Sequence, residues 1–417
     1  MPPRTSLKGF LATARAALTA PPSKRPSPLT FVVGNESADL DSLCSALLLA
    51  YFRTYAPPQL LSKARGAGTL HIPVCHLYRP DLALRPEFTA VLRDADIRGE
   101  DVFTLEDVLS RGDISPEETR WLLVDHNALT GSLAAPFASR VGGCVDHHAD
   151  EDVVARDAEI RVIERSGSCA SLVVECCAEI WEMLAQDDGD ESGDREIIDD
   201  RIARLALASI MLDTAGLQEP SRTTEHDKRA VELAEARIAG PGVYDREGVF
   251  ARLSALKEDL ADMTFRDVLR KDYKEWRVDE LGLGTSSVPR GFGYLTREKE
   301  GSGNGAALKE ALANWGVERD GVAKIDLVAI LTAFRDAEGT FRRELLVWGR
   351  SEVGVRAARR FEERYGGELG LTAWEGGKLD LDGGEQQLRR CWTQGSVSYS
   401  RKQLAPMLRD VLKEVSG

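Results

Sequence analysis

The densest group of reactive side chains in this sequence is Asp146-His147-His148, which holds two of only six histidines among 417 residues. It follows an apolar run at residues 141–145 that is typical of a buried strand. Ligands of α/β proteins commonly bind beyond the carboxyl ends of strands, and neutral imidazole beside carboxylate suits Mn²⁺, Zn²⁺ or iron. The tripeptide therefore predicts a metal or ligand site where this strand ends.

A strand-to-helix turn earlier in the chain carries a pair of carboxylates. Asp39 and Asp41 stand two residues apart between an apolar run at residues 30–33 and a helical pattern at residues 43–51. Both carboxylates can reach one point, and the backbone amides at the start of a helix favour anions. Aspartate is also an ordinary helix cap. Capping and ligand binding are therefore both open for this turn.

Two more carboxylates occupy comparable positions at the ends of apolar runs. Asp125 follows the run at residues 121–124, and Asp213 follows the run at residues 205–212. Each position has an ordinary structural explanation, such as a turn at Asp125 or a helix end at Asp213, and His148 could be a core histidine. One shared site accounts for all of these positions together, whereas the ordinary explanations require a separate coincidence for each.

The carboxylates and one imidazole form a ligand set that is rich in oxygen: Asp39, Asp41, Asp125, His147 and Asp213. Such a set suits a pair of hard or borderline cations, Mg²⁺ or Mn²⁺ with Co²⁺ as a further candidate, better than a closed tetrahedral zinc site. Two such ions about 3.5–4 Å apart can share a hydroxide and hold the attacking and leaving oxygens of a phosphoryl group. The predicted chemistry is hydrolysis of a phosphoester or a phosphoanhydride.

Apolar runs typical of buried strands recur in the first part of the chain, at residues 30–33, 71–77, 121–124, 141–145 and 159–163. Helical periodicity between several of them predicts an α/β fold with a doubly wound, mainly parallel sheet. Helical patterns follow at residues 171–184, 197–212, 225–239 and 249–260. From about residue 263 the pattern changes, with strand-like runs at residues 291–295, 327–334 and 344–347 and a closing helix at residues 402–415. We therefore expect a smaller mixed α/β domain after the first.

The composition argues against two classes of partner. A formal net charge of −14 is unfavourable for general nucleic-acid binding, which needs a basic surface. The sequence contains no apolar run of about 18 residues, so we expect no membrane partner. Seven cysteines without a CxxC pair are typical of reduced core residues. These features favour a cytoplasmic globular protein.

The N-terminal segment, residues 1–29, has two interpretations. It carries basic side chains and no acidic ones, around an amphipathic run at residues 7–18. That composition fits a mitochondrial transit peptide, which would direct the protein to the matrix. We favour a short basic helix beside the first strand, followed by a Pro-rich connector, because the segment is poor in serine.

Four segments resemble, in order, the motifs of the DHH phosphoesterase superfamily: residues 34–42, Asp125-His126-Asn127, Asp146-His147-His148 and Asp213. Residues 272–275 and 400–403 resemble the substrate-binding signatures of the DHHA2 domain. The resemblance implies a DHH catalytic domain at residues 30–260 and a DHHA2 substrate-binding domain at residues 261–417. It also implies an active site in the cleft between the two domains.

One position departs from part of this family. The manganese-dependent inorganic pyrophosphatases have a histidine where this chain has Asn35, whereas the form with Asn35 is similar to that of the fungal cytosolic exopolyphosphatases and the prune-type phosphodiesterases. The resemblance therefore implies an exopolyphosphatase that releases orthophosphate from the end of inorganic polyphosphate. The alternatives are an inorganic pyrophosphatase, a prune-like enzyme acting on short chains or nucleotides, and a non-catalytic scaffold that binds polyphosphate.

The resemblance also implies roles for individual residues. The metal pair would be held by the five ligands named above, with Asp125 as the bridge. His148 would donate a hydrogen bond or a proton to the phosphate, and Asn35 and His126 would orient ligand or substrate. Cations of the DHHA2 signatures would offset the repulsion between an acidic protein and a polyanion: Lys274, Arg401 and Lys402.

Overall fold

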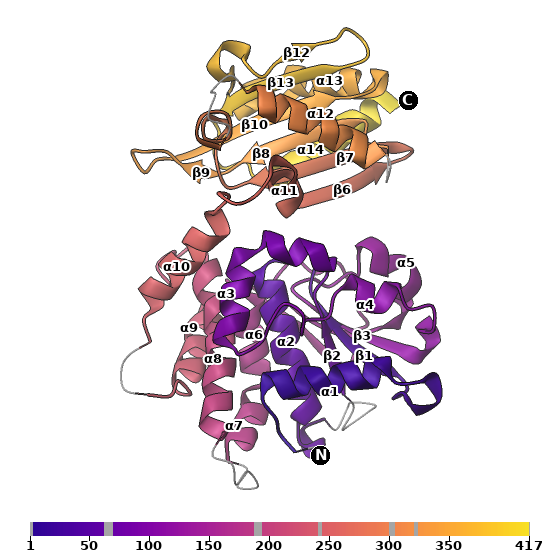
Figure 1. Cartoon of the computed structure of the whole chain (residues 1–417), viewed down its shortest axis with the longest axis vertical. Helices are drawn as coiled ribbons and strands as arrows, with labels where there is room; N and C mark the ends of the chain where they lie inside the picture. Colours follow the sequence, from indigo (N-terminus) through magenta and orange to yellow (C-terminus); the bar gives the residue numbers. More distant parts are fainter. Residues whose placement is uncertain are drawn as a thin grey trace. The chain divides into compact units, whose positions relative to one another are not determined.

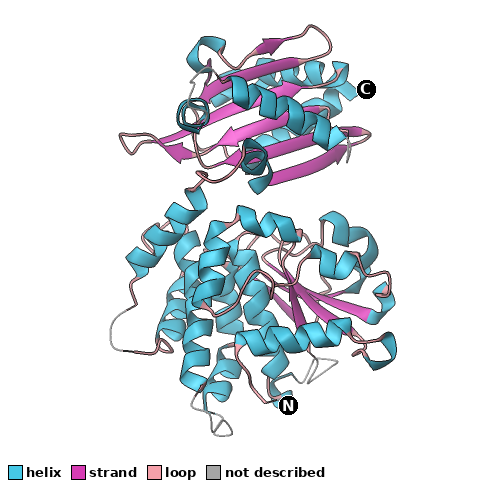
Figure 2. Cartoon of the chain, viewed as in Figure 1, coloured by secondary structure: helices cyan, strands magenta, loops and turns pink. Residues whose placement is uncertain are grey.

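The computed structural model describes residues 3–61, 70–186, 194–240, 244–299, 305–320 and 324–416. The chain divides into two compact units, Met1–Lys257 and Glu258–Gly417. The division falls near the end of helix α10 (Arg246–Glu258), whose colour in Figure 1 lies between those of the two units. Each unit contains one main sheet with helices packed on it (Figure 2).

The described strands of the first unit form a five-stranded parallel sheet in the order β2-β1-β3-β4-β5. Their bounds are β1 (Leu29–Val33), β2 (His71–Val74), β3 (Thr119–Val124), β4 (Val141–Asp146) and β5 (Ile160–Ile163). The strands β1 and β2 are buried along their whole length, as expected for a parallel sheet covered on both faces. Because β1, β3 and β4 are neighbours, the loops that follow them leave the same edge of the sheet.

Helices from distant parts of the sequence cover this sheet. The helix α2 (Leu40–Tyr55) packs on β1 and β2 and also contacts α6 (Cys169–Cys176) and α8 (Arg195–Asp213). All of its residues are buried because it lies between the sheet and other helices. Further helices of the unit are α3 (Pro86–Asp94), α4 (Leu105–Leu109), α5 (Ala134–Phe137), α7 (Ala178–Gln186) and α9 (Glu225–Glu235).

The N-terminal segment forms a helix of the first unit. Ser6 caps α1 (Leu7–Thr19) by accepting a hydrogen bond from the amide of Gly9, and the apolar face of α1 joins the core of the unit. Phe10 is fully buried and packs edge-on against the ring of Tyr51. Arg4 forms an ion pair with Asp199. The basic segment therefore packs on the first unit as a helix, in contact with β2.

The second unit contains a mixed sheet in the order β11-β13-β10-β8-β7-β6, with β12 paired to β13 and β9 paired to β10. Alternate residues of β8 face two different cores. Leu327, Ala329 and Leu331 belong to the core that includes α13 (Glu352–Leu369) and α14 (Arg401–Ser416). Val328 and Ile330 belong to the core on the other face, which includes α11 (Phe265–Lys271) and α12 (Ala306–Asp320). The alternation is the period-two pattern of a strand buried on both faces.

The bounds of the strands of this sheet are β6 (Tyr273–Val278), β7 (Leu281–Val288), β8 (Leu327–Thr332), β9 (Phe334–Arg335), β10 (Phe341–Gly349), β11 (Leu371–Ala373), β12 (Leu381–Asp382) and β13 (Leu388–Gln394). The strand predicted at residues 291–295 is wrong, because Phe292 begins a helical turn that continues as a π-helix at Tyr294–Lys299. The amide of Phe292 donates to Glu344 Oε2 at 2.6 Å, so a partner distant in sequence takes the place of a neighbouring strand. The sequence pattern does not show that contact.

Three further observations complete the fold. The seven cysteines are free thiols, and all of them except Cys176 are buried. Within the described ranges, none of the helices combines the length and the apolar character needed to cross a bilayer. The helix expected at residues 171–184 is interrupted at Cys177, which separates α6 from α7.

Candidate metal centre

Four of the five candidate metal ligands, all except Asp213, follow three neighbouring strands. The segments after Val33, Val124 and Val145 leave adjacent parallel strands at one edge of the sheet. Asp125 has a left-handed φ of 62°, which turns the chain as β3 ends, and its amide donates to the carbonyl of Val145 at 3.0 Å. This unusual backbone conformation keeps the carboxylate of Asp125 between the other two segments.

The carboxylate of Asp125 connects the first of these segments to the third. Its Oδ2 accepts hydrogen bonds from Asn35 Nδ2 at 2.7 Å and from Ser42 Oγ at 2.6 Å. Its Oδ1 lies 3.1 Å from His147 Nε2. Asn35 and Ser42 therefore orient the carboxylate so that Oδ1 is the oxygen available to a cation.

Asp41 is held by donors from several parts of the chain. Its Oδ1 accepts from the hydroxyls of Ser168 at 2.8 Å and Ser209 at 2.9 Å, and two backbone amides at the start of α6 donate to the carboxylate at 2.6 and 2.9 Å. Its Oδ2 lies 4.0 Å from His147 Nε2. Asp41 therefore organises the N-terminus of α6 and presents one oxygen to the histidine.

Asp39 and Asp213 are the other two carboxylates among the candidate ligands. Asp39 caps α2, because its Oδ1 accepts from the amide of Ser42 at 3.1 Å. Asp213 is the last residue of α8 and is partly buried. Burial and the charges of Asp41 and Asp39 raise the pKa of Asp213 well above its usual value, and burial with the same two charges raises the pKa of Asp125 to about 7. Carboxylates that oppose one another's ionisation in this way favour a cation among them.

His147 is oriented toward these carboxylates by its backbone contact. Its Nδ1 lies 3.0 Å from the carbonyl oxygen of Ser166, so Nδ1 carries the hydrogen and Nε2 faces Asp125 and Asp41. Burial acts to lower the pKa of His147, but the hydrogen bond with Asp125 and the charges of Asp41 and Asp125 outweigh it and raise the pKa to about 10. In this geometry a proton on Nε2 occupies the position that a metal ion would take.

His148 is positioned by a carboxylate to which the sequence interpretation gave no role. Asp146 is fully buried, and its Oδ1 lies 2.8 Å from His148 Nδ1 while its Oδ2 accepts from Asn127 Nδ2 at 2.6 Å. Burial alone would raise the pKa of Asp146, but the hydrogen bonds from His148 and Asn127 lower it. Asp146 is therefore ionised and holds the imidazole of His148, whose side chain is 41% exposed, with the hydrogen on Nδ1.

His126 lies in the same loop but is turned into the protein. Its Nδ1 is 2.9 Å from the carbonyl oxygen of Val124, and burial lowers its pKa to about 4. Its Nε2 is buried and has no hydrogen-bond partner among the described residues. His126 is therefore a neutral imidazole next to Asp125 in the chain, and its contact with substrate remains a prediction.

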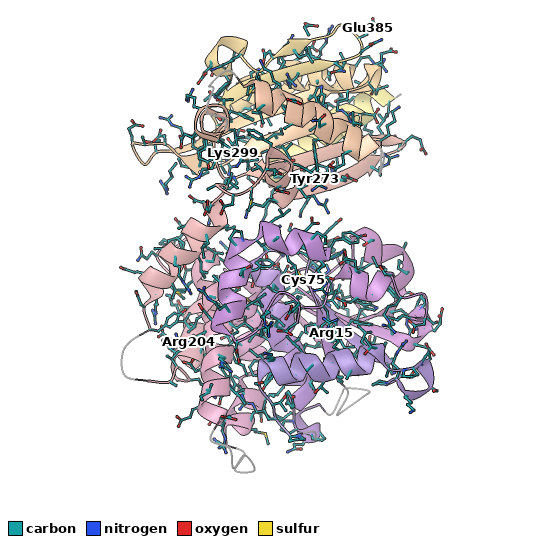
Figure 3. The ribbon with its side chains drawn as sticks, viewed as in Figure 1. Arg15, Cys75, Arg204, Tyr273, Lys299 and Glu385 are labelled. Atoms are coloured by element: carbon teal, nitrogen blue, oxygen red, sulfur yellow. The ribbon has the colours of Figure 1, made fainter. Side chains whose placement is uncertain are left out.

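The predicted substrate-binding cations belong to the second unit. Arg401, the first residue of α14, donates from Nη1 to Asp272 Oδ1 at 2.9 Å and to the Asp272 carbonyl oxygen at 3.1 Å. Asp272 directly precedes Tyr273, which is labelled in Figure 3 and begins β6. Lys274 is the next residue of that strand, and Lys402 is exposed. The ion pair thus brings the two DHHA2-like segments to one corner of this unit and neutralises part of the charge of Arg401.

The donor atoms fit a divalent cation. Asp125, His147 and His148 form a group whose ligand atoms all lie within 4.8 Å of one another, and Asp41 Oδ2 adds a second carboxylate near His147. Oxygen ligands with one or two imidazoles suit Mn²⁺ or Mg²⁺. Asp39 contributes to the raised pKa of Asp125, and Asp125 in turn contributes to the raised pKa of Asp213, so both carboxylates are electrostatically linked to this group. The structure therefore brings one imidazole and two carboxylates into contact, with two further carboxylates within electrostatic reach.

We expect Mn²⁺ binding to release about one proton at pH 8, because His147 must lose the proton that its raised pKa of about 10 retains. Protons compete with the metal, so the apparent affinity should rise as the pH increases toward 10 and fall at lower pH, where Asp125 also becomes protonated. Calorimetric titration in two buffers with different ionisation enthalpies measures the release. Identical heats in both buffers would contradict it.

Comparison with known proteins agrees with the fold and the order of motifs. The model of the DHH family N-terminal domain matches residues 30–210, and the model of the DHHA2 domain matches residues 251–411. A solved structure described as a "putative family II inorganic pyrophosphatase" from Methanococcus jannaschii is 20% identical, covers 92% of this chain and 99% of its own, and has a TM-score of 0.52. This likeness shows a shared fold.

Three curated relatives carry names that describe an activity. A Schizosaccharomyces pombe protein named "Putative exopolyphosphatase" is 28% identical, over 99% of this chain and 97% of its own. The human "Exopolyphosphatase PRUNE1" is 29% identical, over 97% of this chain and 79% of its own. An Archaeoglobus fulgidus "Probable manganese-dependent inorganic pyrophosphatase" is 27% identical, over 62% of this chain and 71% of its own. With both domain models matched in order, the chain consists of a DHH family N-terminal domain followed by a DHHA2 domain.

Proposed function

We propose that the protein is a metal-dependent hydrolase of phosphoanhydride bonds, and more narrowly an exopolyphosphatase that releases orthophosphate from the end of inorganic polyphosphate. The observation that best supports the proposal is the group of carboxylates around Asp125, with His147 facing Oδ1 and Asn35 donating to Oδ2. The similarity to a protein named "Putative exopolyphosphatase" over 99% of this chain supports the choice of substrate.

The residues of the candidate centre have two proposed roles, to bind the metal ions and to orient their ligands. When bound, a pair of divalent ions would lower the pKa of water and neutralise charge on the phosphate. Asp39, Asp41, Asp125, His147 and Asp213 are the proposed ligands. Asn35 fixes the orientation of Asp125 through its hydrogen bond to Oδ2.

His148 is the proposed donor to the phosphate. Asp146 holds the hydrogen of Nδ1, so in the imidazolium form of His148 the second hydrogen lies on Nε2, from which it can be donated to a phosphoryl oxygen as a hydrogen bond or a proton. The exposed side chain makes this nitrogen accessible to a ligand from solvent. We expect Asp146→Asn to lower kcat with little change in metal affinity, since Asp146 acts through His148.

Two other functions remain as candidates. Pyrophosphatase activity is favoured by the relative from Archaeoglobus fulgidus named "Probable manganese-dependent inorganic pyrophosphatase", although Asn35 stands where that group has histidine. A non-catalytic scaffold that binds polyphosphate would have the same fold. The full set of carboxylates argues against a scaffold, because a centre that had lost its activity should have lost some of them.

Chain-length profiling separates these candidates. Orthophosphate release by the purified full chain would be measured on pyrophosphate, tripolyphosphate and long-chain polyphosphate with Mg²⁺, Mn²⁺ or Co²⁺. We expect turnover of tripolyphosphate and longer chains to exceed that of pyrophosphate by about tenfold or more, a difference of roughly 1.4 kcal/mol in activation free energy. Rapid hydrolysis of pyrophosphate alone would favour the pyrophosphatase, and no release from any substrate would favour the scaffold.

We expect Arg401→Ala to raise KM for polyphosphate by about tenfold while changing kcat little, because it removes a guanidinium that can bind phosphate. Lys413→Ala is the matched control, since Lys413 is an exposed cation in the last turn of the same helix. Steady-state kinetics on long-chain polyphosphate measure KM and kcat of both variants. A loss of kcat with unchanged KM would contradict the proposed role of Arg401.

A further inference from the structure

Arg85 places a positive charge inside the first unit, beside the loop that carries Asn35 and Asp39. It follows the 3-10 helix η3 (Arg79–Leu84), and only 5% of the residue is exposed. Its Nη2 donates to the carbonyl oxygen of Ser37 at 2.9 Å. The guanidinium carbon also lies 5.9 Å from the centre of the Phe88 ring.

This guanidinium has no acidic partner among the residues that the structure describes. Two other arginines of the same unit whose side chains are little exposed are paired: Arg4 with Asp199 and Arg53 with Glu159. A guanidinium has five N–H groups, and a buried charge without a partner is costly. The one carbonyl contact and the aromatic ring leave most of the hydrogen-bonding capacity of Arg85 unused.

The position of Arg85 connects it to the candidate metal centre. The amide of Ser37 donates to Asn35 Oδ1 at 2.8 Å, and Asn35 Nδ2 donates to Asp125 Oδ2 at 2.7 Å. The buried thiol of Cys75, labelled in Figure 3, has a pKa raised to about 12 by burial, which the charge of Arg85 lowers and that of Asp39 raises. The charges of Arg85 and Asp39 therefore both act on the Cys75 thiol. Arg85 contacts Ser37, which is hydrogen-bonded to Asn35, the residue that orients Asp125.

We propose that Arg85 binds a phosphate group of the substrate at the loop formed by residues 35–39. The proposal rests on the function proposed above for the nature of that substrate, a condensed phosphate. The carbonyl of Ser37 fixes one edge of the guanidinium, and the remaining N–H groups match phosphate oxygens in pairs. Arg85 would also supply a cation from within the metal-bearing unit of a chain whose net charge is −14.

Neutralising Arg85 tests the proposal on the full-length protein. We expect Arg85→Gln to raise KM for tripolyphosphate by about 10- to 100-fold, with kcat within about threefold of wild type, because a charge-assisted bond to phosphate is lost. Arg85→Lys keeps the charge but not the paired donors, so its KM should lie between those of the wild type and Arg85→Gln. Arg79→Gln is the matched control, since Arg79 begins the same 3-10 helix and is ion-paired with Asp107, and its KM should stay within about twofold.

A binding measurement separates this proposal from the proposed function. Calorimetric titration with imidodiphosphate in the presence of Mg²⁺ needs no turnover, and Arg85→Gln should weaken binding by the same 10- to 100-fold. If the wild type hydrolyses nothing but shows this dependence on Arg85, the phosphate site stands and the proposed activity fails. If both Arg85 variants fold and bind as the wild type does, or if they lose only Mn²⁺ affinity, Arg85 is a structural brace of the loop and the proposal is overturned.

Discussion

Asp125→Asn should reduce polyphosphate turnover by about 10³-fold or more, because it removes a ligand on which the metal centre depends. Asn35 and Ser42 both donate to Oδ2 of Asp125. The amide oxygen of the variant must take that position, so the amide nitrogen faces His147, where a cation would bind. Orthophosphate release measures the loss of turnover, and Mn²⁺ titration measures the loss of metal affinity.

The same substitution should leave the metal-free protein folded. The charges of Asp39 and Asp41 oppose ionisation of Asp125 and contribute to its raised pKa, so removing its charge relieves repulsion in the absence of metal. We therefore expect a melting temperature at or above that of the wild type in chelator, and no upward shift when Mn²⁺ is added. A variant that is unfolded in chelator, or that retains the Mn²⁺ shift, would contradict the assigned role of Asp125.

Asp41→Ala should instead destabilise the protein by about 3–5 kcal/mol even without metal, because it leaves several buried donors without an acceptor. The hydroxyls of Ser168 and Ser209 and two amides of α6 all donate to this carboxylate. Asp41→Asn should lose less stability, since the amide retains one acceptor oxygen. Urea denaturation in chelator measures the difference.

Asp199→Asn is the control for this effect. Asp199 is a buried carboxylate of the same unit that pairs with Arg4 and accepts from Trp181 Nε1 at 2.7 Å. Its loss should destabilise the fold but leave Mn²⁺ affinity unchanged, whereas both Asp41 variants should lose affinity. If Asp41→Ala unfolds at the same urea concentration as the wild type, the hydrogen bonds to α6 do not have the stabilising role assigned to them.

The sequence predicts where the site lies because the candidate ligands stand at the ends of the same apolar runs that predict the strands. Asp125 and Asp146 stand at the ends of apolar runs that are typical of buried strands, and the strands of a parallel sheet have their carboxyl ends at one edge. The sequence did not predict which oxygen each carboxylate offers. That depends on donors such as Ser168 and Ser209, which lie 127 and 168 residues from Asp41.

Other features escaped prediction for related reasons. Asp146 was visible as part of a motif, but its full burial and its hold on His148 appear only in three dimensions. Arg85 resembles any arginine after a proline-containing turn until its missing acidic partner is seen among the described residues. The strand expected at residues 291–295 failed because Glu344 binds the amide of Phe292. In each case the conformation or the role of the residue depends on a tertiary contact that the local sequence pattern does not show.

The most direct test of the central claim is anomalous diffraction from crystals soaked in Mn²⁺. We expect a peak at coordination distance, about 2.0–2.3 Å, from both Asp125 Oδ1 and His147 Nε2, with Asp41 as a further ligand. A second peak near Asp39 and Asp213 would complete the proposed pair. Peaks only at other acidic residues, with Asp125 and His147 still in contact with each other, would contradict the metal centre and the activity proposed from it.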